Sequence, residues 1–359
     1  MTGIREHVPL APYTTLRLGG PARYFIESAS ENDVRAALAF GADRDVPVYI
    51  LGGGSNVVFP DAGFPGLVVR ITIGGLDYRA GPLPEVTAGA GVDWDTLVAG
   101  TVERGWTGIE CLSGIPGTVG GTPIQNVGAY GQEVAETLVS VTCLDRTTLE
   151  RKTFTATDCA FGYRDSRFKR GDRGRYVVLD VTFRLARDRH PGIRYAELKN
   201  AVERVQALAA LAPAEGVHLV RQTVLTLRRG KSMVLDPNDP NTRSVGSFFT
   251  NPVLPVAAFA QLEARWRTMR GAQSSPIPTF PADGAVKVPA GWLVEQAGFP
   301  KGFRRGGAGI SSRHALALVN FGGTAAELLA LAEEVRAGVE SRFGVRLEFE
   351  PEIVGEGRE

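Results

Sequence analysis

The segment 46–59 constrains the fold of this chain more than any other part of the sequence. A run of β-branched and apolar residues leads into three consecutive glycines at 52–54, followed by Ser55 and Asn56, after which strand-like residues resume. Both flanks are typical of strands, so the glycines predict a tight turn between two strands. Glycine permits positive φ there and lets a ligand approach the main chain. On this segment alone, an ordinary glycine hairpin is the alternative.

The turn also differs from the dinucleotide-binding pattern G-x-G-x-x-G. That pattern requires a helix after the glycines, and Val57 stands where its last glycine should be. Successive N–H groups in a turn can form a concave anion-binding surface without a helix dipole. The sequence therefore predicts a pyrophosphate-binding turn of another kind.

Composition and charge are those of an ordinary globular protein. The chain has 359 residues, enough for two or three domains, and 43% of them are apolar while 22% are charged. The formal net charge of +1 gives no reason to expect a nucleic-acid or membrane surface. We expect neither kind of partner, and because nothing in the sequence demands an assembly, we expect a monomer.

The cysteines and histidines predict no metal site. Cys111, Cys143 and Cys159 lack metal-ligand spacing and cannot all pair, so buried reduced thiols are expected, which indicates a reducing compartment. The four histidines are scattered. The first residues lack the pattern of a secretory signal, and no apolar run approaches the roughly 20 residues that span a bilayer. The cytoplasm is the expected location.

The first half of the chain alternates short strands with helices. Ser30 and Asp33 have the spacing of a helix N-cap, and Asp93 begins a second helix that Gly105 ends. Residues 108–133 contain too many glycines and prolines for a long helix but are too apolar for a linker, so we expect an irregular, buried, ligand-contacting stretch. Strands are expected near residues 66–71, 84–88, 141–144, 153–155 and 176–185.

The second half changes in character. Residues 197–231 are mostly helical in pattern, and we place a domain boundary near residue 215. Thr324 begins a capping box for the last long helix, which Gly344 ends. The alternation over residues 346–350 predicts a final strand.

Four further segments, taken with the glycine turn, resemble one enzyme family. They are residues 114–121 with 125–131, residues 161–166 (FGYRDS), residues 246–252 (GSFFTNP) and residues 351–353 (PEI). In this order and spacing the chain resembles the UDP-N-acetylenolpyruvoylglucosamine reductases, flavoenzymes of peptidoglycan precursor synthesis, from about Thr14 to Ile353. Any one segment is weak support, whereas five in register are specific.

The resemblance implies the fold class and the domains. It implies an α+β protein in which a two-lobed, vanillyl-alcohol-oxidase-like domain binds FAD noncovalently and a C-terminal α+β domain closes over a UDP-sugar. We expect lobe 1 at residues 1–75, lobe 2 at 76–215, the substrate domain at 216–345, and a C-terminal segment at 346–359 that returns to the active site.

The resemblance also implies a reaction in two halves. NADPH gives a hydride to flavin N5, and the reduced flavin then passes a hydride to C3 of UDP-N-acetylglucosamine-enolpyruvate while a proton goes to C2, which yields UDP-N-acetylmuramate. The negative charge that develops next to the substrate carboxylate favours a nearby cation, and C2 needs an acid. By resemblance, Arg164 polarises the carboxylate, Ser247 donates the proton, and Glu352 is a second acid on the opposite side. We expect Glu352 to turn inward, because Pro351 ends the strand before it and apolar residues follow.

Matching positions supply the ligand contacts. The residues matched to FAD are Gly52, Gly53, Gly54, Ser55 and Asn56 at the pyrophosphate, and Gly117, Thr118, Gly120, Gln125, Asn126 and Gly128 along the isoalloxazine or ribityl chain. Those matched to the UDP-sugar are Tyr130, Tyr195, Arg228, Lys231 and Asn251. Tyr195 matches the lid tyrosine of the longer type of this family. Residues 304–307 could add a contact at the rim of the flavin site.

Each matched side chain has a structural alternative. Without the resemblance, Arg164 would be an exposed strand arginine and Ser247 a helix N-cap. Glu352 would be a solvated carboxylate and Tyr195 a core aromatic. The cations around Arg228 would be a solvated helix end, favourably placed on the helix dipole.

Two other functions compete with the reductase. The first is an oxidase or dehydrogenase of the same FAD fold that acts on an alcohol or phenol. Many of those attach the flavin covalently through a histidine, and the glycine region here contains none. The second is a nucleotide-binding module without catalysis, which predicts no flavin that NADPH can reduce.

Overall fold

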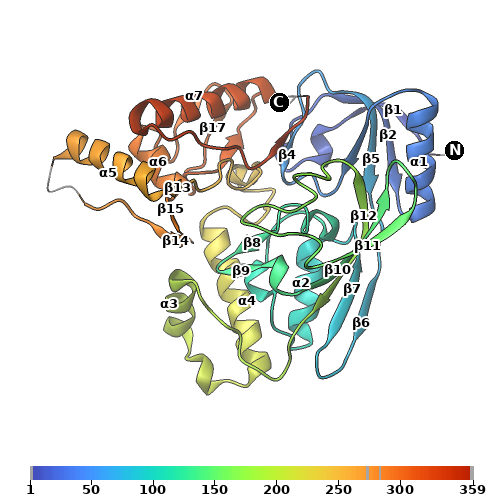
Figure 1. Ribbon diagram of the computed structural model, residues 1–359, viewed down its shortest axis with the longest axis horizontal. Coiled ribbons are helices and arrows are strands. Elements are labelled where there is room, and N and C mark those ends of the chain that lie inside the picture. Colours follow the sequence, from blue (N-terminus) through green and yellow to red (C-terminus); the bar gives the residue numbers. More distant parts are fainter. Residues whose placement is uncertain (1–2, 272–274, 283, 356–359) are drawn as a thin grey trace. The chain divides into compact units, whose positions relative to one another are not determined.

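The computed structural model describes residues 3–271, 275–282 and 284–355 (Figure 1). The chain divides into two compact units, and both contain helices and strands, as the α+β prediction requires. The first unit comprises Met1–Pro9, Pro21–Gly54 and Phe64–Val234. The second comprises Leu10–Gly20, Ser55–Gly63 and Leu235–Glu359.

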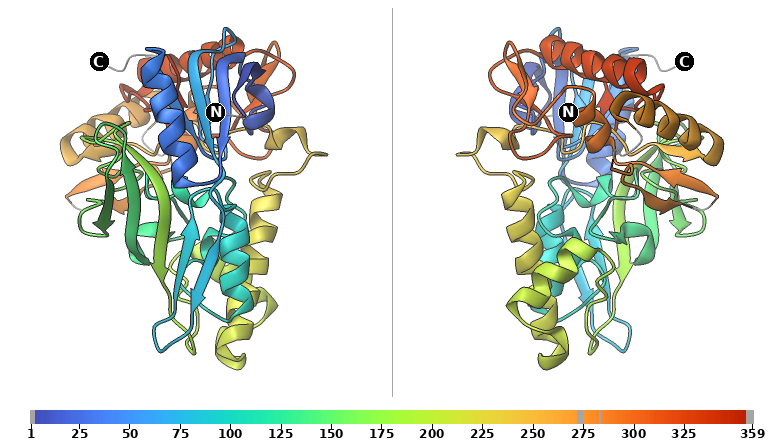
Figure 2. Two further views of the ribbon diagram at one scale, coloured as in Figure 1. Left: turned by 90° about the vertical axis from the view of Figure 1, so that its right-hand side faces the viewer. Right: turned by 90° about the vertical axis from the view of Figure 1, so that its left-hand side faces the viewer.

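A four-stranded sheet opens the first unit. Its order is β1 (Arg5–Pro9), β2 (Pro21–Ser28), β5 (Phe64–Ile71) and β3 (Val48–Leu51), with β1 antiparallel and the other pairs parallel. Helix α1 (Glu31–Asp43) covers one face of this sheet through its buried apolar side (Figure 2). The Ser30 side chain accepts the N–H of Asp33, which confirms the predicted N-cap.

A second sheet in the same unit is antiparallel throughout. Its order is β11 (Arg151–Thr155), β10 (Leu138–Asp145), β12 (Tyr176–Arg184), β7 (Glu85–Gly89) and β6 (Leu76–Arg79). Four of the predicted strands form in this sheet as β7, β10, β11 and β12, the predicted strand near residues 66–71 is β5 of the first sheet, and β6 was not predicted. The expected lobe boundary at residues 75 and 76 falls between the two sheets.

Three helices complete the first unit: α2 (Trp94–Glu103), α3 (Ala196–Val205) and α4 (Pro213–Gly230). The Asp93 side chain accepts the N–H of Thr96, as predicted for a cap, and Trp94 packs edge-on against Phe183 at 5.7 Å between ring centroids. In Figures 1 and 2, α2 and α4 lie side by side, and the two helices are in contact.

The predicted domain boundary near residue 215 differs from the observed division. Residue 215 lies in the first turn of α4, and all of α4 belongs to the first unit, which ends at Val234. The physical reason is that Val220 and Val224 of α4 pack with Cys111 and with Leu198 and Val202 of α3. The change to a helical sequence pattern therefore marks helices that belong to the first unit and does not mark the start of the second.

Residues 108–133 are irregular and largely buried, as predicted. They contain the short 3-10 helices η2 (Glu110–Leu112) and η3 (Val119–Gly121), and they end in the small hairpin of β8 (Gly128–Ala129) and β9 (Gln132–Glu133). A third 3-10 helix, η4 (Val134–Glu136), follows.

The second unit combines helices with two small sheets. One sheet has the order β13 (Val253–Pro255), β15 (Ala285–Lys287) and β14 (Phe280–Ala282), and the other β16 (Arg304–Arg305), β17 (Ala308–Ile310) and β18 (Leu318–Asn320). The helices are α5 (Val256–Arg270), α6 (Ala290–Gln296) and α7 (Ala325–Phe343). Thr324 and Glu327 form the predicted capping box of α7, and Gly344 ends the helix at φ +70°.

The predicted final strand needs correction, and the hairpin alternative for the glycine turn does not hold. Residues 346–350 alternate between exposed and buried side chains, but only Phe349 forms a β-bridge there, with Phe249, so the expected final strand is wrong. The last strand is instead β19 (Glu352–Ile353), which pairs in parallel with β4 (Val57–Val58). Strands β3 and β4 belong to different sheets, so the turn between them is not a hairpin.

The three cysteine thiols are free and buried, as predicted. In the described part of the chain, no helix is both long and apolar enough to cross a membrane. Over those same residues, the His, Cys, Asp and Glu side chains form no group of three or more suited to a metal ion.

Candidate functional site

The glycine turn lies directly against a second glycine segment of the first unit. A Cβ on Gly53 would lie 2.7 Å from Cα of Gly117, and a Cβ on Gly52 would lie 2.9 Å from the Thr118 hydroxyl. Gly54 adopts φ +63°. Side chains are therefore excluded where the two backbones meet, and the structure brings together two glycine segments that the resemblance assigns to FAD.

The first turn of α2 holds this second segment in place. The N–H of Trp94 donates to Gly117 O at 3.0 Å, and Asp93 and Thr118 form a β-bridge. Gly120, which was also matched to FAD, packs on Ala90: a Cβ on it would come within 2.7 Å of the Ala90 methyl. These contacts give the loop a fixed position without large side chains.

Asn126 is a structural residue of the same region. Its side chain is 1% exposed; it donates to Glu133 Oε2 at 2.7 Å and to Gly162 O at 3.0 Å, and accepts the N–H of Ala135 at 3.0 Å. It adopts φ +46°. The amide thus ties the β8–β9 hairpin to the FGYRDS segment. Gln125, its neighbour, is partly buried.

Arg164 lies next to Gly128. It occupies a turn at φ +55°, is partly buried, and donates from Nη2 to Gly128 O at 2.6 Å. A Cβ on Gly128 would lie 2.8 Å from Glu133 Cγ, 2.9 Å from Gln132 O and 3.0 Å from Arg164 Nη1, so a side chain at that position would crowd both the hairpin and the guanidinium. The alternative of an exposed strand arginine does not hold.

Tyr130 and Tyr195 form an aromatic pair. Their rings meet edge-on at 5.5 Å between centroids, and Lys231 Nζ lies 5.8 Å from the Tyr130 ring centroid while pairing with Glu197 at 2.7 Å. Tyr195 precedes α3 and is 37% exposed, so it is not a core aromatic. Burial raises the pKa of Tyr130 to about 12, which keeps its phenol a hydrogen-bond donor at neutral pH.

Arg228 lies in the last turn of α4, and one N–H of its guanidinium has no hydrogen-bond partner among the described residues. Nη2 donates to Met233 O at 2.8 Å, whereas Nε is buried and has no hydrogen-bond partner among the residues that the structure describes. Burial lowers the pKa of this guanidinium, with partial compensation from Tyr130 and Asp95. A buried donor without a partner is unfavourable and indicates a missing acceptor. The alternative of a solvated helix end fits its exposed neighbour Arg229 but not Arg228.

Sequence reasoning missed Asp95 and Arg221. Asp95 Oδ1 accepts Arg221 Nη1 at 2.6 Å and the Gly114 N–H at 2.6 Å, and Oδ2 accepts Arg221 Nη2 at 2.9 Å. Burial by itself would raise the pKa of Asp95, but the Arg221 fork and the Gly114 N–H outweigh it and lower the pKa. In the sequence, Asp95 is one more acid in the first turn of a helix, so no local signal pointed to it.

Ser247 and Glu352 lie in the second unit on segments that are bridged to one another. Glu350 N–H donates to Phe248 O at 2.9 Å, and Glu352 N–H donates to Asn56 O at 3.0 Å. Ser247 is partly buried and follows Gly246 at φ +76°, and no helix begins there, which removes the N-cap alternative.

The prediction that Glu352 turns inward is wrong. Glu352 is exposed, whereas Pro351 and Ile353 on either side of it are buried. The reason is the alternation of side chains along β19, which directs Ile353 into the core of the second unit and Glu352 away from it. Exposure fits the alternative of a solvated carboxylate and equally leaves the group accessible to a ligand.

The remaining predicted contacts of the second unit have structural partners. Asn251 Oδ1 accepts the N–H of Ala290 at the start of α6, at 2.8 Å. In the 304–307 segment, the Arg304 guanidinium lies over the Phe321 ring and Arg305 pairs with Glu334 at 2.8 Å. Ser55 is partly buried, and Asn56 donates from Nδ2 to Glu350 O at 3.3 Å.

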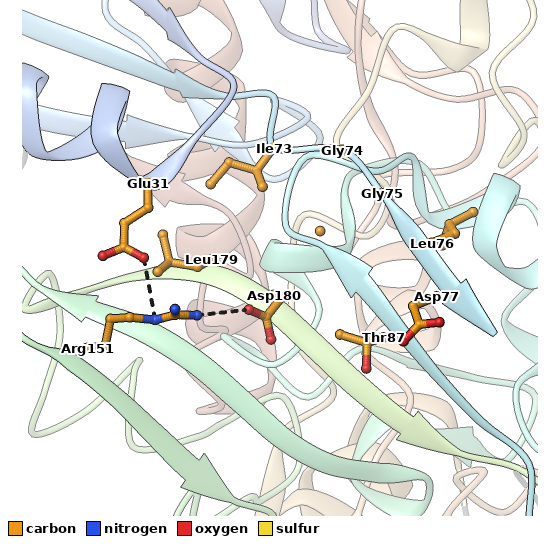
Figure 3. A pocket seen from close by; sticks show the side chains of 11 residues that line it. Glu31, Ile73, Gly74, Gly75, Leu76, Asp77, Thr87, Arg151, Leu179 and Asp180 are labelled. Carbon is orange, nitrogen blue, oxygen red and sulfur yellow. Dashed lines mark ion pairs between the residues drawn. The ribbon is translucent and has the colours of Figure 1, made fainter. Parts of the chain in front are cut away.

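Figure 3 shows a separate groove of the first unit, with a volume of about 450 Å³. Arg151 lies in it between Glu31 at 3.4 Å and Asp180 at 3.9 Å, and Asp77 adds a further carboxylate. None of the predicted site residues lines this groove. The groove carries more carboxylates than cations, whereas a diphosphate requires positive charge, so the groove does not suit a diphosphate.

Comparisons with known proteins agree on one family. The family model for the UDP-N-acetylenolpyruvoylglucosamine reductase C-terminal domain matches residues 237–354, and that for an FAD binding domain matches residues 22–149. A UDP-N-acetylenolpyruvoylglucosamine reductase from Thermobifida fusca is 48% identical over 99% of both chains, and one from Salinispora arenicola is 49% identical over 96% of this chain and 94% of the relative. A crystal structure of the Thermus caldophilus enzyme has a TM-score of 0.65 at 25% identity and covers 98% of this chain and 99% of that chain.

Proposed function

This chain belongs to the family of UDP-N-acetylenolpyruvoylglucosamine reductases, and from that membership we propose the roles of its individual side chains. It is an FAD-dependent oxidoreductase that uses NADPH to reduce UDP-N-acetylglucosamine-enolpyruvate to UDP-N-acetylmuramate in peptidoglycan synthesis. The observation that carries this conclusion is the 48% identity to a relative over 99% of both chains. The fold is an FAD-binding domain of the vanillyl-alcohol-oxidase type with the C-terminal domain of this family.

The residues of the first unit fit an FAD pyrophosphate. At the contact of Gly53 with Gly117, a Cβ would collide with main-chain atoms, so two glycine backbones can present N–H groups to an anion without obstruction. When bound, FAD supplies the hydride chemistry, accepting a hydride from NADPH and delivering one to the enolpyruvyl double bond. We assign the pyrophosphate to residues 52–56 and the rest of the cofactor to the 117–128 segment.

Arg164 orients and polarises the substrate carboxylate. Its guanidinium donates from Nη2 to Gly128 O, which anchors the fork, and a planar guanidinium can bind a carboxylate through two parallel hydrogen bonds. A cation fixed in this way stabilises the charge that develops on the carboxylate when C3 is reduced. Lysine would supply the charge but not the planar fork.

Ser247 donates the proton that C2 receives, and Glu352 is the second acid. The main-chain bonds from Glu350 to Phe248 and from Glu352 to Asn56 hold both residues on neighbouring segments of the second unit. A serine hydroxyl is a weak acid in water, but C2 becomes strongly basic as C3 accepts the hydride, so a hydroxyl held against it can protonate it.

The UDP diphosphate binds at the end of α4. Arg228 has a buried donor without a partner, Lys231 lies above Tyr130, and the Tyr130 phenol stays protonated, so the three provide donors of the kind that phosphate oxygens require. Tyr195 acts as the lid, which makes this chain one of the longer type. By the resemblance, Asn251 of the second unit is assigned to the substrate as well. We expect the enzyme to act as a monomer in the cytoplasm.

A visible spectrum tests the proposal directly. The purified protein, kept anaerobic, should be yellow, bleach with NADPH, and regain its colour when UDP-N-acetylglucosamine-enolpyruvate is added. Bleaching without recovery would retain the FAD fold and refute the substrate. A colourless protein that FAD cannot reconstitute would refute the whole assignment.

A further inference from the structure

The carboxylate of Asp95 joins a loop to a helix. It accepts the Gly114 N–H and both Nη groups of Arg221, with all three distances between 2.6 and 2.9 Å. The side chains of Asp95 and Arg221 are 33% and 16% exposed, so the pair is more shielded from water than most surface pairs. A bidentate ion pair of this kind fixes both the position and the orientation of the two side chains.

The loop that Asp95 holds, residues 114–117, leads to the contact between Gly117 and Gly53. It begins at Gly114, bonded to Asp95, and ends at Gly117, whose carbonyl accepts the N–H of Trp94 at 3.0 Å. Two successive residues of the first turn of α2 therefore hold both ends of the loop. Gly114 is only three residues from Gly117, whose Cα would lie 2.7 Å from a Cβ on Gly53.

Helix α4, to which Asp95 is joined through Arg221, also carries Arg228, the residue proposed to bind the diphosphate. Arg221 and Arg228 are both on α4, two helical turns apart and hence on the same side. Gly114 packs against this side: a Cβ on it would lie 2.8 Å from Leu225 Cδ2 and 3.6 Å from Arg228 Nε. Asp95 is thus the carboxylate whose charge acts on both arginines. The Arg221 fork occupies this carboxylate, and Arg228 Nε is buried without a hydrogen-bond partner among the described residues.

We propose that Asp95 and Arg221 are positioning residues that fix the 114–117 loop on α4, so that the FAD contact and Arg228 are set by one ion pair. The proposal rests on the roles proposed above for that loop and for Arg228. Asp95 holds the loop through the Gly114 N–H. Arg221 neutralises Asp95 and so prevents this carboxylate from capturing Arg228.

Three variants separate these two effects. Asp95→Ala removes the acceptor for Gly114 and should weaken FAD retention by the holoenzyme at least tenfold. Asp95→Asn keeps an acceptor oxygen and should retain FAD within about threefold of wild type. Arg221→Met keeps the apolar stem and the Gly114 bond; it should leave FAD retention nearly unchanged but raise KM for the UDP-sugar at least tenfold, with kcat changed less than threefold.

Asp145 provides a matched control. Its carboxylate also accepts a two-nitrogen contact from one arginine, Arg175 at 2.9 Å, and main-chain N–H groups, from Thr147 and Thr148, in the same unit. None of these partners belongs to the proposed site. Asp145→Ala should lower the melting temperature without changing FAD retention or KM.

The measurements are FAD fluorescence released on dilution of the holoenzyme, and steady-state KM and kcat. The proposal is overturned if Asp95→Ala retains FAD as Asp145→Ala does, or if Arg221→Met leaves KM unchanged. If Asp95→Ala gives no folded protein, Asp95→Asn and Arg221→Met decide: a tenfold or greater loss of FAD in either variant refutes the separation of roles. Wild-type protein that binds no FAD would refute the proposed function itself, before any variant bears on this pair.

Discussion

The carbonyl oxygen of Asn56 accepts the N–H of Glu352 at 3.0 Å. The last residue of the glycine turn and the proposed second acid are thus held together by a main-chain bond, although nearly the whole chain separates them in sequence. The Asn56 side chain adds a bond to Glu350 O at 3.3 Å. The position of the Glu352 main chain is therefore set by the hydrogen bonds of the backbone and of Asn56.

Replacement of Glu352 by Gln tests its role as an acid. Bleaching of the bound flavin by NADPH should stay near the wild-type rate, whereas recovery of colour with the enolpyruvyl substrate should slow by about 10²-fold or more, the range of general acid catalysis. Stopped-flow absorbance measures both steps. Glu348→Gln is the matched control, because Glu348 is an exposed carboxylate on the same segment. Unchanged turnover in Glu352→Gln would return Glu352 to a solvated surface position.

Replacement of Ser247 by Ala tests the proton donor. We expect reduction by NADPH to be nearly normal and reoxidation by substrate to fall by roughly 10²- to 10⁴-fold, because the proton for C2 is no longer supplied. Ser312→Ala, at an exposed serine of the same unit, serves as the control. Equal slowing of both half-reactions in Ser247→Ala would contradict the role.

Tyr130 should act as a neutral donor throughout the working pH range. Burial raises its pKa to about 12, so the phenol does not ionise between pH 6 and pH 10. We expect Tyr130→Phe to raise KM for the UDP-sugar about tenfold, the loss expected for a hydrogen bond to a charged group. The ratio of mutant to wild-type KM, measured from pH 6 to pH 10, should be constant. A ratio that falls towards one near pH 9 would show that the phenol ionises there.

Asp95 should make stability depend on pH in the acid range. Its pKa is lowered in the folded protein, so its contribution is fully present above the usual value of 3.8 and is lost as the pH falls through the folded value. We expect Asp95→Asn to reduce the free energy of unfolding by about 2 kcal/mol at pH 7, and the difference from wild type to shrink below about pH 4. Urea unfolding at several pH values measures this. Val217→Ala, at a fully buried residue of α4, should cost the same at every pH.

The three thiols should be unreactive in the native enzyme. All are 0% exposed, and burial raises the pKa of each, to about 12 for Cys159. Labelling with a chromogenic disulfide reagent should report no thiol in native protein and three in urea. Rapid labelling of one thiol under native conditions would show local opening around that cysteine.

Local sequence determined several of the elements and their ends. The Ser30, Asp93 and Thr324 caps and the Gly344 stop were predicted and are confirmed, because capping depends on side chains a few residues away. The buried strands of the second sheet could also be predicted, because the alternation of side chains along a strand is a local property of the sequence. The family, and with it FAD and the reaction, was also carried by the sequence, in five short segments in register.

Tertiary structure decided which distant residues meet. The alternation over residues 346–350 was right, but strand formation needs a partner, and the partner of the C-terminal segment is the short β4 next to Asn56. The extent of the first unit depended on α4 packing against α3, which no boundary signal near residue 215 reveals. Asp95 was an ordinary first-turn acid until folding placed Gly114 and Arg221 around it. Hydrogen bonds and burial between residues far apart in the chain arise from the packed fold, and for that reason the sequence could propose candidate site residues but not their arrangement.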